Sequence, residues 1–195
     1  MRPSIIGISG GIGSGKSVVS RILRIWGYPV FDCDSEAKAL MDADDNIKNN
    51  LSTLISTEVV ADGVIDRRRL AEIVFADEAK LAILNSIVHS AVRQYFTEWA
   101  RNNDAPVVFA ESAILHSSGM IADVDFEWHV DAPCDIRIER VCRRNGMTPD
   151  QVKARMASQK ADETPDCYPV PLTLIINDNA TPLLPQLTTA LKPII

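Results

Sequence analysis

The chain has 195 residues, of which 46% are hydrophobic, so it is long enough to bury a core of its own. Its formal net charge of −6 argues against a general nucleic-acid-binding protein, because affinity for a phosphate backbone requires an excess of lysine and arginine. No apolar run approaches the roughly 18 residues needed to span a bilayer, and the first residues lack a signal-peptide core. We therefore expect a cytoplasmic protein with neither membrane nor nucleic acid as a partner.

The four cysteines of the chain form neither a CxxC pair nor a cluster with histidine. Neither a disulfide framework nor a zinc site is indicated, so we interpret all four as ordinary buried thiols. They are Cys33, Cys134, Cys142 and Cys167.

Short apolar and β-branched runs alternate with helical patterns along the chain, which predicts a parallel sheet covered by helices on both faces. Five of these runs have the length of strands. They are residues 4–8, 29–31, 107–110, 127–130 and 173–176. The fold class that we expect is therefore α/β, with a five-stranded parallel sheet in one domain.

Two helical segments carry apolar residues at the spacing of a helix, and we expect both stripes to face the core. The first consists of Val18, Val19, Ile22, Leu23 and Trp26, directly after the first strand. The second consists of Leu81, Leu84, Val88, Val92, Tyr95 and Trp99.

Residues 35–103 separate the second predicted strand from the third and are far longer than a crossover requires. This segment shows helical patterns only, broken by the turn signal Asp62-Gly63. We predict an inserted helical subdomain here, with residues 1–34, 104–136 and 172–195 forming the core around the sheet. Residues 162–171 are rich in proline and acidic side chains and are expected to form a loop.

Gly10, four further residues and Gly15-Lys16-Ser17 fit the pattern GxxxxGK[ST], between a predicted strand and an amphipathic helix. The glycines let consecutive N–H groups turn inward as an anion-binding nest, and the positive end of the helix points to the same place. Lys16 is expected to reach the outer phosphates and Ser17 to bind Mg²⁺ through its hydroxyl.

This loop therefore predicts binding of the phosphates of ATP or GTP, against the alternative of a glycine-rich turn without a ligand. The residues expected to contact the nucleotide are Gly11, Ile12, Gly13, Ser14, Gly15, Lys16 and Ser17.

Two acids follow the second predicted strand, and a third acid closes the next one. Because side chains alternate along a strand, Asp32 and Asp34 are expected to project to the same side, at the edge of the sheet where ligands bind. One of them would accept the proton of an attacking hydroxyl while the other orients Mg²⁺-bound water. The alternative is that one of them, Asp32 above all, caps the helix that begins near Ser35. Glu111 is expected to hold Mg²⁺ through water, although acids commonly end strands.

Four arginines crowd the predicted helix before Asn145-Gly146, in a chain that is acidic overall. They are Arg137, Arg140, Arg143 and Arg144. Arg140 and Arg144 are four residues apart, hence on one helical face, and can close over the γ-phosphate to neutralise charge during transfer. The alternative is a solvated charged face.

Six segments resemble the dephospho-coenzyme A kinase family in their order and spacing, and they cover most of residues 5–160. They are GISGGIGSGKSVV, VFDCDSEAKALM, DGVIDRRRLAEIVF, LNSIVHSAV, VVFAESAIL and RRNGMTPDQVKARMASQ. The resemblance implies a P-loop NTPase-type kinase core, an insertion that binds the coenzyme A precursor, and a helical lid over residues 137–171. It also implies transfer of the γ-phosphoryl group of MgATP to the ribose 3′-hydroxyl of dephospho-CoA.

By the same resemblance, Asp34 is the general base, and Lys16, Arg140 and Arg144 assist the transfer. Asn177 is the remaining expected ATP contact. The residues expected to bind the acceptor are Asp32, Arg67, His89, Arg93 and Glu111. Asn85, His89 and Arg93 share the polar face of the long helix. Arg67 follows Asp66 at a helix start, where an anionic substrate group or plain exposure to solvent would explain it equally well.

The chain departs from the family's usual residues at Val18, Cys33 and Ser90, none of which removes a reacting group. Residues 162–166 are acidic, whereas relatives usually carry basic residues after the position of Gln159. A GTPase is disfavoured because DxxG and NKxD motifs are missing. Another small-molecule P-loop kinase, acting on a nucleoside or nucleotide, remains the alternative. We expect a monomer or a weak homo-oligomer.

Overall fold

The computed structural model describes residues 2–159 and 169–194. Five strands form one sheet in the order β2-β5-β1-β6-β7, and every neighbouring pair is parallel. They are β1 Ser4–Ser9, β2 Val30–Asp32, β5 Val107–Glu111, β6 Phe126–Asp131 and β7 Leu172–Ile176. The predicted α/β fold with a parallel five-stranded sheet is confirmed, and each predicted strand is present with its ends shifted by at most one residue.

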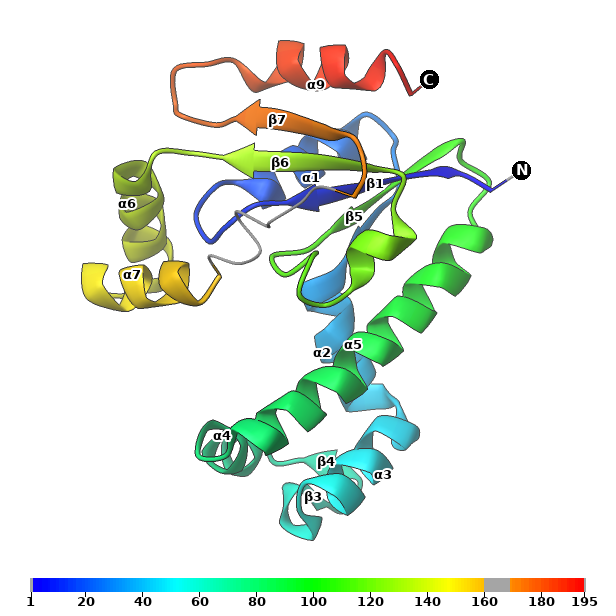
Figure 1. Ribbon diagram of the computed structural model, residues 1–195, viewed down its shortest axis with the longest axis vertical. Helices are drawn as coiled ribbons and strands as arrows, with labels where there is room; N and C mark the ends of the chain where they lie inside the picture. The colour runs from blue at the N-terminus through cyan, green and yellow to red at the C-terminus, as the bar shows by residue number, and fades with distance from the viewer. Residues whose placement is uncertain (1, 160–168, 195) are drawn as a thin grey trace. The chain divides into compact units, whose positions relative to one another are not determined.

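The chain starts in the middle of this sheet, because β1 lies between β5 and β6 (Figure 1). All strands are parallel, so their carboxyl ends share one edge, and the loop after β1 leaves the sheet at the centre of that edge. In open α/β sheets the ligand crevice forms at this edge, where connections depart to opposite sides.

Contacts divide the chain into two units, of which the first contains residues 1–32 and 99–195 and holds the sheet. Its helices are α1 Lys16–Ile25, the short 3₁₀ helix η2 Met120–Asp123, α6 Cys134–Asn145, α7 Pro149–Ser158 and α9 Leu183–Leu191. Helix α6 stands beyond the arrowhead of β6, and α9 runs beside β7 (Figure 1). The core of this unit is built from strand residues and one face of α1, with Phe109 packed edge-on against both Tyr28 and Trp128.

The second unit contains residues 33–98. Its elements are α2 Cys33–Ala43, α3 Asp45–Leu54, η1 Thr57–Val59, β3 Val60–Ala61, β4 Val64–Ile65, α4 Arg67–Phe75 and most of α5 Glu78–Arg101. It has its own apolar cluster, formed by Ile47, Leu51, Ile55, Val59, Ile65, Leu70 and Val74. The roles of core, insertion and lid given to these segments stay predictions.

The expectation that this second unit is helical throughout is wrong, because β3 and β4 form an antiparallel hairpin. Asp62 and Gly63 join the two strands with φ values of 51° and 74°. Two consecutive positive φ values are typical of the type I′ turn, whose twist matches a tight hairpin. The turn signal was therefore real, but its strands are too short to show a period of two.

Both apolar stripes include residues that the structure exposes. Val18 is 47% exposed and Trp26 38%, whereas Val19 and Leu23 are fully buried. On α5, Tyr95 is 40% exposed and the buried position is Phe96. Neighbouring residues on a helix differ by about 100° in direction, so a stripe that contains two neighbours can bury only one of them well.

The cysteines differ in exposure. Cys33 is buried as expected, Cys142 is half-buried, and Cys134 is exposed at the start of α6, so the expectation of burial is wrong for Cys134. Cys167 and the acidic residues 162–166 lie outside the described residues, as does most of the loop predicted for residues 162–171. No helix in the described ranges is long and apolar enough to cross a membrane.

Candidate active site

The glycine-rich loop between β1 and α1 packs so tightly that three of its glycines leave no room for a side chain. A Cβ on Gly10 would lie 2.2 Å from the Val130 carbonyl oxygen, one on Gly13 2.6 Å from the Arg137 carbonyl oxygen, and one on Gly15 2.0 Å from Asn177 Nδ2. All three glycines also have positive φ values, 132°, 81° and 101°. The shape of the loop is therefore fixed by its own backbone and by its contacts with β6, α6 and the residue after β7.

Lys16 is the first residue of α1, and its side chain folds back over the loop. Its ammonium donates a hydrogen bond of 2.5 Å to the Gly10 carbonyl oxygen. No side chain in the described ranges caps α1, and its first turn carries no acidic residue. The positive end of the helix and the Lys16 ammonium thus face the same loop, which favours an anion there. Ser17, the next residue, is exposed.

Two carboxylates meet beside this loop, at the ends of neighbouring strands. Asp32 and Glu111 are register partners in β2 and β5, and Glu111 is also the partner of Ile8 in β1. Burial raises the pKa of Glu111, and the charge of Asp32 adds to the rise, while the Ser20 hydroxyl and the Lys16 ammonium oppose it. Asp32, Glu111 and Lys16 therefore act on one another electrostatically.

Asp34 does not continue the strand that contains Asp32. Strand β2 ends at Asp32 and α2 begins at Cys33, so Asp34 lies in the first turn of a helix. The expectation that the two carboxylates share one side by strand alternation is therefore wrong, because the backbone changes from strand to helix between them. An acid in the first turn is stabilised by the helix dipole, and Asp34 is exposed there. The helix begins two residues earlier than the expected start near Ser35.

Arg140 holds the far side of the loop. It lies on α6, and its guanidinium donates to the carbonyl oxygens of Gly13 and Ser14 at 3.3 Å each. It also donates to the Asn177 carbonyl oxygen at 2.9 Å and to Asn179 Oδ1 at 2.5 Å. Asn177 in turn donates from Nδ2 to the Ser14 carbonyl oxygen at 2.8 Å. The loop carbonyls are thus bound on the arginine side.

A second arginine and a glutamine bind the two backbone polar groups of one residue in the middle of the loop, Ile12. The buried Arg137 donates from Nε to the Ile12 carbonyl oxygen at 2.9 Å, and the Ile12 N–H donates to Gln159 Oε1 at 2.9 Å. The sequence placed Arg137 in the basic run without a role and gave no role to Gln159. Gln159 lies directly after α7, and a single glutamine at that place does not by itself indicate a contact with the loop.

Arg144 makes different contacts from Arg140. It is exposed near the end of α6, where Nε donates to the side chain of its neighbour Asn145 at 2.8 Å. Arg140 is engaged with the loop, and the pairing of the two arginines over one phosphate, expected from their spacing, stays a prediction.

Three of the five expected acceptor-binding residues, Arg67, His89 and Arg93, lie in the second unit, whereas Asp32 and Glu111 lie in the first. His89 and Arg93 are half-buried on α5, and Asn85 is exposed. Arg67, at the start of α4, forms an ion pair of 2.7 Å with Asp42 of α2. A carboxylate of the protein therefore already balances Arg67, and no substrate anion is needed to explain it.

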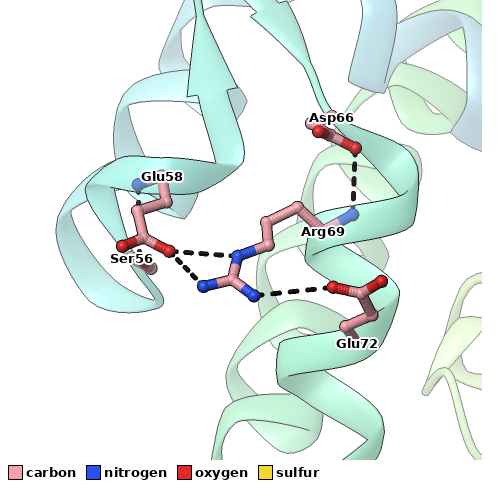
Figure 2. A network of polar contacts seen from close by, with 5 residues as sticks. All are labelled: Ser56, Glu58, Asp66, Arg69 and Glu72. Carbon is pink, nitrogen blue, oxygen red and sulfur yellow. Dashed lines mark hydrogen bonds and ion pairs between the residues drawn. The ribbon is translucent and has the colours of Figure 1, made fainter.

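The adjacent Arg69 joins α4 to the segment before the hairpin. Figure 2 shows its guanidinium between Glu58 of η1 and Glu72 of α4, with a two-pronged contact to the Glu58 carboxylate. The hydrogen bond to Glu58 and its charge raise the pKa of Arg69 above its ordinary value. Asp66 caps α4 by accepting from the Arg69 N–H at 2.9 Å, and Ser56 caps η1 by accepting from the Glu58 N–H. Arg69 thus has a structural role within this unit.

Comparisons of the sequence with known proteins agree on one family. Residues 4–180 match the family model of dephospho-CoA kinase. Over 183 residues the chain is 39% identical to the dephospho-CoA kinase of Bacteroides fragilis, covering 93% of this chain and 88% of that protein. It is 42% identical over 159 residues to that of Porphyromonas gingivalis, covering 82% and 79%.

Two solved structures share the fold. The crystal structure of TT1252 from Thermus thermophilus gives a TM-score of 0.78 at 36% identity and covers 100% of this chain and 97% of that one. The dephospho-CoA kinase of Campylobacter jejuni gives 0.65 at 20% identity and covers 97% and 96%.

Proposed function

Because the chain belongs to the dephospho-CoA kinase family, we propose that it phosphorylates the ribose 3′-hydroxyl of dephospho-CoA with ATP, giving coenzyme A and ADP. This is the last step of coenzyme A biosynthesis. The observation that supports it most is the phosphate loop at the centre of the sheet edge, with Lys16 folded over it and α1 starting beneath it.

ATP binds, in this proposal, with its phosphates against the backbone of residues 11–17. The carbonyls of Gly13 and Ser14 are bonded to Arg140 and Asn177, so these acceptors are already satisfied within the protein, and backbone N–H groups of such a loop can bind the anion. Lys16 neutralises charge on the outer phosphates.

Residues at this loop fit a magnesium ion. The Ser17 hydroxyl and the carboxylates of Asp32 and Glu111 are oxygen donors, which Mg²⁺ prefers. Ser17 would hold the ion directly, with Asp34 or Glu111 binding through water. When bound, the ion neutralises charge that develops on the β- and γ-phosphates.

The chemical step moves one phosphoryl group and one proton. The 3′-oxygen forms a bond to the γ-phosphorus, the bond from that phosphorus to the β,γ-bridging oxygen breaks, and Asp34 accepts the hydroxyl proton. The main role of Arg140 is to hold the loop in shape. Arg144 is exposed, and we assign it to the γ-phosphate as the arginine of the lid. His89, Arg93 and Arg67 of the second unit are assigned to the acceptor, with Asp32 and Glu111 at the sheet edge.

The test is an acceptor panel. Purified protein with MgATP is assayed for ADP release in the presence of dephospho-CoA, adenosine, AMP or no acceptor, and the position of the new phosphate is identified by NMR. We expect dephospho-CoA to be strongly preferred, with a 3′-phosphate in the product. Lys16→Ala should abolish transfer, whereas Lys192→Ala, which removes an exposed cation after α9, should not. Preference for a nucleoside or nucleotide would reassign the enzyme within P-loop kinases.

Water is the fourth acceptor in that panel. Fast ATP hydrolysis without dephospho-CoA would contradict a lid that keeps water from the phosphates. A cytoplasmic location and a monomeric or weakly associating state complete the proposal and stay predictions.

A further inference from the structure

A buried polar cluster lies directly under the start of the phosphate loop, outside the residues assigned so far. Glu127 is fully buried on β6, and Ser9 on β1 and His129 on β6 are 2% and 8% exposed. His116, from the turn segment after β5, completes the cluster. We name these four residues the Glu127 cluster.

The hydrogen bonds of this cluster have a definite direction. Ser9 Oγ lies 2.5 Å from Glu127 Oε1 and 2.9 Å from His129 Nδ1. The serine hydroxyl has one proton, which it donates to Glu127, so it accepts from His129 Nδ1–H. His116 Nε2 lies 3.0 and 3.1 Å from the two Glu127 oxygens and donates to them. Glu127 thus accepts hydrogen bonds from Ser9 and His116. Ser9 is bonded to two residues of β6, Glu127 and His129.

A fully buried carboxylate is expensive in a sheet whose core is built mainly from apolar side chains. Trp128 and Val130 alternate with Glu127 and His129 along β6 and pack into the apolar core. An apolar residue at position 127 would avoid the cost of removing a charge from water. The hydrogen bonds of Glu127 reach the last residue of β1 instead, which is where the phosphate loop begins.

The cluster connects to Lys16 in two steps. Ser9 is followed by Gly10, which packs against the Val130 carbonyl so closely that a Cβ would lie 2.2 Å from it. The Gly10 carbonyl oxygen in turn accepts the Lys16 ammonium. A shift of Ser9 would therefore move the group that orients Lys16.

We propose that Glu127 is a positioning residue, which fixes Ser9 and thereby sets the start of the phosphate loop and the place of the Lys16 ammonium. This inference rests on the proposed function, because it takes the loop to bind ATP. It predicts an effect mainly on ATP binding, since bound phosphates hold Lys16 themselves once ATP is in place.

Four variants test the inference. Glu127→Gln keeps the size of the side chain but offers one acceptor oxygen to two donors, and Ser9→Ala removes the hydroxyl altogether. Each is expected to raise the dissociation constant of ATP about tenfold, with kcat at saturating ATP changed less than about twofold. Ser9→Thr keeps the hydroxyl and should retain wild-type affinity. Trp128→Phe, on the opposite face of β6, is the matched control and should lower Tm without weakening the binding of ATP.

Titration calorimetry with ATP and Mg²⁺, together with Tm, separates the outcomes. Combining Glu127→Gln with Ser9→Ala should weaken the binding of ATP no more than either change alone, because both changes disrupt the same hydrogen bond between Ser9 and Glu127. Wild-type affinity in Ser9→Ala, or equal weakening in Trp128→Phe, would overturn the inference and leave the proposed function standing. Absence of ATP binding by the wild-type protein would overturn both. If Glu127→Gln does not fold, the comparison of Ser9→Ala with Ser9→Thr decides alone.

Discussion

Asp34 and Asp32 stand two residues apart in different elements, so their substitution separates two roles. Asp34→Asn keeps the shape of the side chain but cannot take a proton, so we expect kcat to fall by about 10²–10⁴-fold with ATP affinity nearly unchanged. Steady-state kinetics with a separate ATP titration measure both quantities. A loose transition state depends more on positioning than on proton removal, which favours the lower end of this range.

The control for this substitution is Asp135→Asn, another exposed acid in the first turn of a helix, at the start of α6. It accounts for the loss of a favourable charge at a helix start and should leave kcat unchanged. If Asp32→Asn lowers kcat much more than Asp34→Asn does, the proton acceptor is Asp32.

The buried carboxyl of Glu111 makes the free energy of unfolding depend on pH. Burial raises the pKa of this carboxyl above its ordinary 4.5. Between 4.5 and the raised value the folded chain binds more protons at this site than the unfolded chain does. Its contribution to the free energy of unfolding is therefore greatest at low pH and declines as pH rises through that window.

Glu111→Gln removes this decline. The free energy of unfolding of the variant minus that of the wild type should be more positive at about pH 7.5 than at pH 4.5. Urea unfolding of both proteins at both pH values measures this difference. Glu139→Gln, at an exposed carboxyl of α6, is the control for introducing an amide. A stability difference for Glu111→Gln that is the same at both pH values would contradict the assigned direction.

At the scale of elements, α6 supports the phosphate loop through Arg140. Arg140→Ala removes hydrogen bonds from a charged group to loop and Asn177 oxygens, so we expect a loss of about 1.5–3 kcal/mol in the free energy of unfolding and weaker ATP binding. Arg140→Lys should recover little, because an ammonium lacks the planar fork that reaches separate acceptors. Denaturant unfolding and ATP titration measure the two effects.

Arg143→Ala is the matched control, since Arg143 is exposed on the same helix. Arg144→Ala should keep full stability but lower kcat if this residue meets the γ-phosphate. An unchanged stability in Arg140→Ala would show that the loop keeps its shape without α6.

Elements were predictable where their pattern is long enough to count. The five strands stand out as apolar runs between helical segments, and the phosphate loop is fixed by the positions of its glycines. The hairpin of β3 and β4 was missed because two-residue strands carry no periodicity, although Asp62-Gly63 marked its turn. The change from strand to helix at Cys33 was missed because cysteine is compatible with both.

At the scale of the whole molecule, the order of strands in the sheet decides which residues meet, and order leaves no local trace in a sequence. β5 lies between β2 and β1, which brings Glu111 beside Asp32 and near Lys16. The same order sets β6 against β1 and so places Glu127 under Ser9. Each of these residues was visible in the sequence, but only the assembled sheet makes them neighbours.

Two units in one chain allow the ATP site to be located by its effect on stability. ATP at 100 times its dissociation constant adds about 2.7 kcal/mol to the folded state, which corresponds to a rise of about 5–10 °C in Tm for a chain of this size. Lys16→Ala should lose this rise, whereas Lys192→Ala should keep it. Hydrogen exchange should slow most in residues 10–18, within the unit that holds the sheet. Protection confined to residues 33–98 would show that ATP binds elsewhere than the phosphate loop.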